Sequence, residues 1–462
     1  MRERGHSARD PHPKIEFIEN GLSAGTWRLE VALRATPLGE TTAQQTLQLL
    51  QELLKDYHPR NFAIQLWDGT QWDGEPGQFC RFTWKINSPA ALRAALEAGD
   101  ELALAEAYIA GDFDIEGNVE AVYPLGLYLV KRRWSLKEKL HLRGLLQALP
   151  SEKKARPERP GAKVSGRVHS KERDQKVVSY HYDVSNDFYA LWLDRAMVYS
   201  CAYFKSPDDD IDTAQAQKLD YICRKLRLRR GERLLDIGCG WGGLILHAVQ
   251  HYGVRALGIT LSQHQFDLAN QRIREASLSD HCAVKLCDYR EVDEPGAYDK
   301  LVSVGMVEHV GKGMLPEYFR QAFRLLRPGG VFLNHGIGQA GNHPAPDKPT
   351  FTSLYVFPDG ELVPIGTMLQ TAEEAGFEVH DVENLREHYV LTLRQWVRRL
   401  EAHAERARQI AGEIKYRIWR LYMAGSAYQF RKGWLDLYQS LLVKTQEGPS
   451  GLPLRRADWY DG

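Results

Sequence analysis

The sequence predicts an α/β protein whose larger part is a doubly wound, mostly parallel sheet, preceded by a small α+β region. Two observations lead to this fold class. From about residue 230, short apolar runs alternate with segments of helical periodicity, as in parallel sheets that are covered by helices. A chain of 462 residues is also too long for one ordinary hydrophobic core, so two domains are expected.

The boundary between these domains is expected in the stretch PSEKKARPERPGAKVSG, residues 150–166. Its Pro, Gly and Lys residues are typical of a linker. We therefore divide the chain into an N-terminal accessory domain with its basic linker, residues 1–165, and a second domain, residues 166–462.

The accessory domain shows strand signals followed by helical ones. FAIQLWDGTQW carries Asp68–Gly69 between two apolar runs, which predicts a β-hairpin. CRFTWKI predicts a further strand, and SPAALRAALEAGDELALAEAYIAG predicts a helical segment. VKRRWSLKEKLHLRGLLQAL predicts a basic amphipathic helix. Such a helix can lie on an anionic membrane surface, or it can dock on protein with its basic face in solvent, and both interpretations stay open.

The second domain supplies the parallel sheet. The expected strands are RLLDIG, RALGIT, AVKLCD, YDKLVSV and VFLNHGI. The expected helices are GLILHAVQHYG, a segment from about Ser262, and PEYFRQAFRLLRP. In such sheets, ligands bind beyond the carboxyl ends of the strands. The stretch GMVEHVG, residues 305–311, directly follows the strand YDKLVSV and therefore lies at such an end.

Composition limits the partners and the compartment. Lys plus Arg equals Asp plus Glu at 60 each, so the net charge indicates no polyanionic partner such as a nucleic acid. The 6 cysteines form no CxxC pair, which argues against a zinc site or a disulfide framework and for a reducing compartment, and no metal is expected. The first residues contain no apolar signal-peptide core, and no apolar run approaches the roughly 20 residues of a membrane-spanning helix. We expect a soluble, cytoplasmic protein.

The strongest motif is LLDIGCGWGG, residues 234–243, whose glycines include Gly238 and Gly240. Taken alone, this pattern would fit a dinucleotide. However, Asp236 precedes the first glycine, where a carboxylate would repel a pyrophosphate but attract a cationic amino-acid group. The next strand ends with Thr260 and Gln265 and without the acidic residue of a nicotinamide site. The pattern therefore favours S-adenosylmethionine, although a glycine turn without a ligand stays the alternative.

A polar pair follows the strand AVKLCD. Asp288 and Tyr289 can bind the adenine amino group and cover its ring. A polar strand end without a ligand is the alternative.

Several further segments, taken in order around this motif, carry a family resemblance. They are HYDVSNDFYALWLDRAMVYSCAYF, ITLSQHQ, GMVEHVG, LNHGIG, YVFPDGELVP, REHYVLTLRQW and YMAGSAYQFRKG. Residues 170–445 closely resemble the cyclopropane-fatty-acid synthase family, which includes the mycolic acid cyclopropane synthases. The resemblance implies a seven-stranded class I methyltransferase sheet with added helices that form a lipid tunnel. It also implies an enzyme that transfers the methyl group of S-adenosylmethionine to a cis double bond of a phospholipid acyl chain and then closes a cyclopropane ring.

The resemblance also implies roles for individual residues. Five residues would surround a bound bicarbonate that acts as the base. Cys201 and Ile337 would donate backbone N–H groups to it, and Glu308, His335 and Tyr389 would use their side chains. Cys201 is therefore not expected to act as a nucleophile. Tyr199 and Ser200 would contact the methionine end of the cofactor, Gly238 and Gly240 would form the loop, Thr260 and Gln265 would contact the ribose, and Asp288 and Tyr289 would lie near adenine.

Electrostatics restricts the role of Glu308. Two unit negative charges about 4 Å apart repel by roughly 4 kcal/mol at an effective dielectric constant of 20. Glu308 beside bicarbonate therefore needs a shared proton or a positive charge, which His335 could supply. We expect Glu308 to orient the anion and not to be the main proton acceptor, and we leave His309 outside the catalytic set. Aromatic faces can stabilise a carbocation. Tyr199, Tyr389 and Phe204 are candidates, with ordinary core packing as the alternative.

Other interpretations remain. The product could be a mid-chain methyl or methylene group on the same lipid, because these outcomes diverge only after the methyl transfer. A small-amine N-methyltransferase or a lipid-binding or cofactor-sensing module without catalysis are further alternatives. Three places depart from the family pattern and put acyl-chain selectivity in doubt: Gly336, Asp359 and Val390–Leu391. By resemblance, the protein would contact the inner face of the membrane peripherally, take an unsaturated phospholipid there, and form a homodimer.

Overall fold

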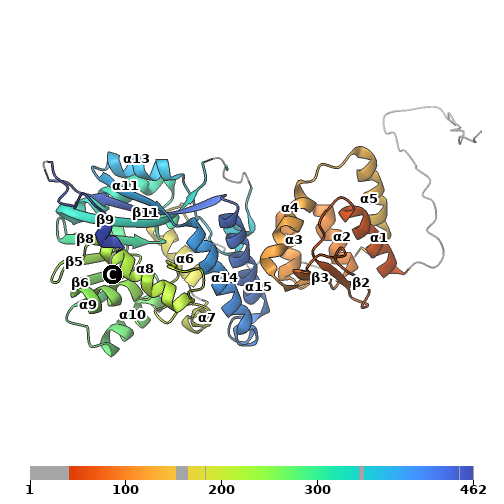
Figure 1. Ribbon diagram of the computed structural model, residues 1–462, viewed down its shortest axis with the longest axis horizontal. Helices are drawn as coiled ribbons and strands as arrows, with labels where there is room; N and C mark the ends of the chain where they lie inside the picture. The colour runs from red at the N-terminus through yellow and green to blue at the C-terminus, as the bar shows by residue number, and fades with distance from the viewer. Residues whose placement is uncertain are drawn as a thin grey trace, which may run out of the picture. The chain divides into compact units, whose positions relative to one another are not determined.

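The computed structural model describes residues 41–151, 165–182, 184–341, 343, 348–446 and 448–460 (Figure 1). The described chain from Thr42 onward belongs to one compact unit. Most of the expected linker lies outside the described residues, so the domain boundary at residue 165 stays a prediction. None of the described helices is long and apolar enough to cross a membrane.

The accessory region contains a four-stranded sheet with the order β2-β1-β3-β4. Its strands are β1 (Ala63–Leu66), β2 (Gln71–Trp72), β3 (Phe82–Ile86) and β4 (Phe113–Gly117). The hairpin prediction is confirmed, because β1 and β2 pair antiparallel around Gly69, whose φ of 90° favours glycine. Helix α1 (Thr42–Leu54) precedes this sheet.

The helical segment predicted after β3 consists of two helices, α2 (Pro89–Ala98) and α3 (Glu101–Ile109). Gly99 ends α2 in the left-handed conformation, and the Asp100 carboxylate caps α3 by accepting the Ala103 N–H at 2.8 Å.

The basic segment is likewise divided, into α4 (Tyr123–Lys131) and α5 (Leu136–Ala148). Ser135 begins α5 with a capping box. Its hydroxyl accepts the Glu138 N–H, and the Glu138 carboxylate accepts the Ser135 N–H at 2.8 Å. The predicted basic helix is confirmed over Leu136–Ala148, but it begins later than expected because Ser135 caps it.

The second region contains the predicted doubly wound sheet, with seven strands in the order β10-β11-β9-β8-β5-β6-β7. The strands are β5 (Arg233–Ile237), β6 (Arg255–Thr260), β7 (Cys282–Leu286), β8 (Tyr298–Val304), β9 (Leu326–Gln339), β10 (Glu378–Asn384) and β11 (Leu435–Val443). Strands β5 to β9 pair in parallel, whereas β11 pairs antiparallel with both β9 and β10.

Helices cover both faces of this sheet (Figure 1). One face carries α8 (Ile211–Leu226), α9 (Gly243–Tyr252) and α10 (Gln263–Glu275), and the other carries α11 (Leu315–Leu325) and α13 (Ile365–Glu374). Each layer has its own hydrophobic cluster. Ile222, Ile245 and Ala269 belong to the first cluster, and Phe319 and Ala372 belong to the second. The sheet therefore places its loops, and any ligand site, at the carboxyl ends of β5 to β8.

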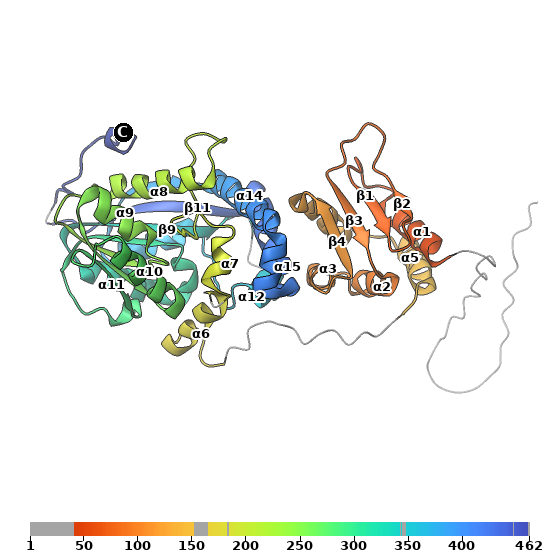
Figure 2. The same ribbon diagram turned by 90° about the horizontal axis from the view of Figure 1, so that it is seen from below.

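Five added helices complete the region. They are α6 (Lys171–Tyr182), α7 (Asn186–Ala190), α12 (Phe351–Tyr355), α14 (Arg386–Ala402) and α15 (Ala404–Arg431). Helix α15 contains a break at Gly412, whose φ is 81°. Helices α14 and α15 pack on each other, and α7 lies beside α15 (Figure 2).

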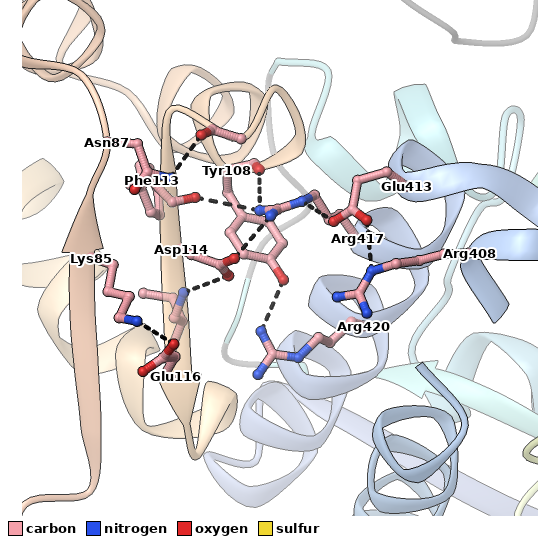
Figure 3. Close-up of polar contacts among 12 residues, drawn as sticks. Lys85, Asn87, Tyr108, Phe113, Asp114, Glu116, Arg408, Glu413, Arg417 and Arg420 are labelled. Carbon is pink, nitrogen blue, oxygen red and sulfur yellow. Dashed lines mark hydrogen bonds and ion pairs between the residues drawn. The ribbon is translucent and has the colours of Figure 1, made fainter. Parts of the chain in front are cut away.

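Helix α15 also binds the accessory region through buried arginines (Figure 3). Arg417 donates to the carboxylate of Asp114 at 2.9 Å and to the backbone carbonyl of Tyr108 at 3.0 Å. Arg420 donates to the Tyr108 hydroxyl at 2.9 Å. These bonds tie α3 and β4 to α15.

Candidate active site

The glycine loop after β5 turns sharply into α9. Gly238, Gly240 and Gly242 all have positive φ, in the region that favours glycine. A β-carbon at Gly238 would lie 3.0 Å from Met306, so even a small side chain would crowd the loop at the end of β8. The backbone N–H groups of Gly238 and Cys239 both donate to the Ile259 carbonyl at 3.0 Å, which fixes the loop against β6.

This loop forms one wall of a cavity at the carboxyl ends of the parallel strands. All nine residues predicted to bind the cofactor line it: Tyr199, Ser200, Asp236, Gly238, Gly240, Thr260, Gln265, Asp288 and Tyr289. We refer to this space as the donor cavity. The structure thus brings together residues from four separate segments of the sequence that we assigned to one ligand.

One end of the donor cavity carries buried charges. Asp236 is 2 % exposed, and its Oδ1 atom has no hydrogen-bond partner among the described residues. Burial raises the pKa of the Asp236 carboxyl to about 7, although Lys218 lowers it. Lys218 also lines the cavity, and its ammonium donates to the Ser200 hydroxyl at 2.9 Å.

The other end is built around an arginine-held carboxylate. Arg290 donates to both oxygens of Asp288, at 2.8 and 2.6 Å, and to Asp174 at 2.8 Å. Between the two ends, the Thr260 hydroxyl donates to the Gln265 side-chain oxygen at 2.6 Å. These bonds hold the polar groups of the cavity in fixed positions without a ligand.

A second polar centre lies at the ends of β8 and β9. The Glu308 carboxylate accepts the backbone N–H of Ile337 at 2.7 Å, so this N–H, expected to bind bicarbonate, is engaged by Glu308. His335 Nδ1 is 3.1 Å from the Gln439 side-chain nitrogen. The second carboxylate oxygen of Glu308 and the Nε2 atom of His335 are both buried and without a hydrogen-bond partner in the described part of the chain.

The protonation of this centre follows from burial. Burial raises the pKa of the Glu308 carboxyl to about 7, although the Ile337 N–H lowers it, so the group holds a proton in much of the population near neutral pH. Burial also holds the pKa of His335 well below its usual value, with Lys218 and Lys225 contributing. His335 is therefore neutral and does not supply the positive charge that we expected of it. The proton on Glu308 removes the need for that charge.

Gly336 and Asp359, two of the departures from the family pattern, have structural reasons. A β-carbon at Gly336 would lie 2.3 Å from the Val307 side chain, so glycine allows the Glu308 segment to approach β9. Asp359 binds Arg173 through both carboxylate oxygens, at 2.5 and 2.8 Å.

Cys201 and Tyr389 lie together at the start of α14. The Cys201 sulfur is 3.8 Å from the Leu385 carbonyl, which also accepts the Tyr389 N–H at 3.2 Å. Burial raises the pKa of the Cys201 thiol, which keeps it neutral and supports the expectation that it is not a nucleophile. Of the five residues expected to hold bicarbonate, Glu308 thus bonds to Ile337, and Cys201 and Tyr389 both approach the Leu385 carbonyl. Among the described residues lining the donor cavity, none of the five is found.

Tyr199 connects the donor cavity to a cluster of aromatic rings. Its ring centroid lies within 5.3–5.9 Å of those of His181, Tyr189, Trp192, Trp396 and Trp419. We call these six residues the aromatic wall. Tyr389 adjoins it with a centroid distance of 6.0 Å to Trp396. Phe204 instead lies beside His388, at 6.4 Å, so its interpretation as a core residue is favoured.

Sequence reasoning missed four polar residues of the donor cavity. Lys218, Arg290, Asp174 and His309 all line it. Lys218 could have been found, since its position in α8 falls on the face that buries Ala214 and Ile222. Burial lowers the pKa of His309 to about 4, so a neutral imidazole lies at the cavity wall although we had left it without a role.

Comparisons with known proteins agree with this geometry. The family model of mycolic acid cyclopropane synthetase matches residues 169–440, and a domain family of unknown function matches residues 49–125. A probable fatty acid methyltransferase of Pseudomonas putida is 41% identical over 402 residues, covering 86% of this chain and 95% of the relative. A cyclopropane mycolic acid synthase of Mycobacterium tuberculosis is 36% identical over 275 residues, covering 57% and 94% of the two chains.

Solved structures show the same relationship. A cyclopropane synthase from Mycobacterium tuberculosis superposes with a TM-score of 0.56 at 33% identity, covering 58% of this chain and 97% of that one. A mycolic acid cyclopropane synthase complexed with SAH and CTAB superposes with a TM-score of 0.55 at 35% identity, covering 58% and 97%.

The seven-stranded sheet, the glycine loop and the donor cavity define an S-adenosylmethionine-dependent methyltransferase with the class I fold. With the comparisons, the assignment becomes more specific. The chain belongs to the mycolic acid cyclopropane synthetase family.

Proposed function

We propose that the protein transfers a methyl group from S-adenosylmethionine to a cis double bond of an unsaturated phospholipid acyl chain and closes a cyclopropane ring. One observation carries the proposal. Tyr199 belongs both to the donor cavity and to the aromatic wall, so the methyl donor would lie beside a buried, apolar and aromatic surface. A carbocation formed from an alkene needs such a dry, aromatic environment, because water would trap it as an alcohol.

The donor cavity fits S-adenosylmethionine, which supplies an electrophilic methyl group when bound. The unpartnered oxygen of Asp236 suits the cofactor's ammonium group, and the glycine loop lets backbone approach its methionine part closely. Tyr289 and the arginine-held Asp288 would contact adenine. A small-amine N-methyltransferase would not need the set formed by Cys201, Glu308, His335 and Tyr389, which disfavours that alternative.

The second polar centre fits a bound bicarbonate, which would supply a base for the proton that the transferred carbon loses. Protonated Glu308 can donate a hydrogen bond to an anion through its unpartnered oxygen, and His335 can donate through Nε2. Glu308 would therefore orient the anion, as we expected from electrostatics. The engaged N–H of Ile337 would hold Glu308 in place instead of binding the anion itself.

The relatives give one specific reason for a second product. The Pseudomonas putida relative is named a probable fatty acid methyltransferase, and a 35% identical relative from Mycobacterium tuberculosis is named tuberculostearic acid methyltransferase. A mid-chain methyl or methylene product would need the same methyl transfer but a different fate of the cation. The donor cavity and the aromatic wall serve either product.

Helix α5 supports peripheral contact with the inner face of the membrane. It docks on α1 and buries Leu142, yet it leaves Leu136 75% and Leu140 63% exposed, one helical turn apart. Lys137, Lys139 and Arg143 are exposed around this pair, as in helices that bind anionic lipid surfaces. Replacing both leucines by serine should reduce co-sedimentation with vesicles rich in anionic phospholipid. Unchanged co-sedimentation would exclude this helix as the contact.

The test is expression in a bacterium that lacks modified fatty acids of its own, followed by mass spectrometry of its phospholipids. The proposal predicts acyl chains that gain one CH₂ and keep it through mild hydrogenation, which reduces a methylene group but spares the ring. A gain that hydrogenation alters would indicate the methylene product. Acyl chains identical to those of cells with an empty vector would contradict the proposal.

A further inference from the structure

Lys218 is a buried cation in the middle of α8 (Ile211–Leu226). It is 1 % exposed and lines the donor cavity beside Tyr199, Ser200 and Asp236. Its single hydrogen bond among the described residues runs to the neutral hydroxyl of Ser200, at 2.9 Å. A lysine ammonium has three N–H donors, so one neutral partner leaves it incompletely satisfied.

The nearby carboxylates do not complete its coordination. Asp194 attracts Lys218 electrostatically, but its two oxygens already accept the backbone N–H groups of Ala196 and Val198, each at 2.8 Å. Asp236 also attracts Lys218, and its Oδ1 is unpartnered in the described part of the chain. The same end of the cavity therefore presents one incompletely satisfied cation and one incompletely satisfied anion.

A second lysine of the same helix shows what a purely structural buried lysine looks like here. Lys225 is also 1 % exposed, but it bonds to the carboxylate of Glu383 and to the Gln439 side-chain oxygen at 2.8 Å. Its ammonium lies over the Tyr221 ring at 4.6 Å. Lys225 is thus neutralised by protein groups and does not line the donor cavity, whereas Lys218 does.

The side chain of Gln215 fixes the backbone around Ser200. Gln215, one turn before Lys218 on α8, donates to the carbonyls of Val198 and Ser200 at 3.2 and 2.8 Å. Helix α8 therefore fixes both the Lys218 ammonium and the Ser200 hydroxyl relative to the glycine loop.

We propose that Lys218 and Ser200 bind the α-carboxylate of the cofactor's methionine part, while Asp236 binds its α-ammonium. A zwitterion matches the paired charges at this end of the cavity, and each buried charge would gain the partner that it lacks. The inference rests on the proposed use of S-adenosylmethionine and adds a positioning role for Lys218. Selection for the cofactor would then depend on its carboxylate.

Calorimetric titration of the full chain tests this assignment without any lipid. The ligands are S-adenosylhomocysteine and its decarboxylated analogue, which keeps the ammonium. The wild-type protein should bind the carboxylated ligand about 10- to 100-fold more tightly, as expected for a charge-assisted hydrogen bond. Lys218→Met should reduce this ratio of affinities to near one, mainly because the carboxylated ligand binds more weakly.

Two variants make the result specific. Lys225→Met, the matched control on the same helix, should keep the wild-type ratio. Asp236→Asn should weaken the binding of both ligands and preserve the ratio of their affinities, because both ligands carry the ammonium group. If Lys218→Met does not fold, Ser200→Ala replaces it and should lower the ratio several-fold.

The outcomes separate the two proposals. An unchanged ratio in Lys218→Met, or in Ser200→Ala where that variant is used, overturns the assignment and leaves the proposed reaction intact. An equal loss in Lys225→Met would also overturn it, because the effect would then come from stability. Absence of S-adenosylhomocysteine binding by the wild-type protein would contradict the proposed function itself.

Discussion

The donor cavity and the aromatic wall share Tyr199 but are built in different ways. The donor cavity consists of short polar loops at the ends of adjacent parallel strands, where hydrogen bonds such as Thr260–Gln265 fix each group. The aromatic wall consists of rings from distant segments, including Trp192 before α8, Trp396 on α14 and Trp419 on α15. The first surface binds by complementary charge, and the second excludes water. The donor cavity therefore binds the methyl donor, and the aromatic wall protects the reaction from water. Substitutions in one surface should leave the function of the other unchanged.

The largest effect is expected at Glu308, which lies outside the donor cavity. Glu308→Leu removes both the hydrogen bond that the protonated carboxyl would donate to an anion and the acceptor for the Ile337 N–H. We expect methyl transfer to fall about 10²- to 10³-fold, in the range of general acid–base effects, with S-adenosylhomocysteine affinity unchanged within about twofold. Steady-state kinetics and calorimetry measure these quantities. Full activity with full dependence on bicarbonate would show that Glu308 has no such role.

A smaller effect is expected in the aromatic wall itself. Trp419 is 3 % exposed and contacts six other rings of the wall and its surroundings, including Tyr189, Trp192 and Tyr199. Trp419→Leu opens space for water, so we expect about tenfold slower turnover and the appearance of hydroxylated acyl chains. Mass spectrometry of the products detects the alcohol. Weaker cofactor binding without any alcohol would mean that the ring supports the donor cavity instead.

The smallest effect on activity is expected where α15 meets the accessory region (Figure 3). Arg417→Met leaves Asp114 and the Tyr108 carbonyl without their arginine donor. We expect the free energy of unfolding to fall by about 2 kcal/mol while methyl transfer stays within threefold. Thermal denaturation measures the change.

Lys85→Met is the matched control for this substitution, because it removes the nearby Lys85–Glu116 pair, whose side chains are 33% and 60% exposed. Such a surface pair contributes at most about 1 kcal/mol. Equal destabilisation by both variants would show that burial of Arg417 has no special importance. If Arg417→Met slowed methyl transfer by much more than threefold while the protein stayed folded, the accessory region would have a part in the reaction.

The same contrast explains what the sequence could predict. The five parallel strands, the helices expected between them and the cofactor residues at their ends follow from local motifs, because parallel strands bring their carboxyl ends to one edge of the sheet. Tyr199 and Ser200, in contrast, were assigned only through the family resemblance. The hairpin at Gly69 was predicted from an equally local signal, the Asp68–Gly69 turn between two apolar runs. The division of the basic segment at Ser135 was missed because periodicity alone does not reveal a capping box.

Long-range contacts were not predictable in this way. Lys218 carried no motif, and its role depends on the 2.9 Å bond to Ser200 and on a neighbouring charge in β5. The engagement of the Ile337 N–H by Glu308 and the neutral state of His335 depend on burial, which sequence spacing does not give. The aromatic wall is formed by segments that lie far apart along the chain, so no local motif predicts it.

Transfer of the cofactor's methyl carbon to the acyl double bond can be measured directly. The assay uses purified protein, vesicles of unsaturated phospholipid, and S-adenosylmethionine with a trideuterated methyl group. We expect acyl chains that gain CD₂, with one deuterium lost to the base. The product should resist mild hydrogenation, and the rate should fall when bicarbonate is removed. Transfer of an intact CD₃ group to a head-group nitrogen, or no label in the lipid although S-adenosylhomocysteine binds, would contradict this expectation.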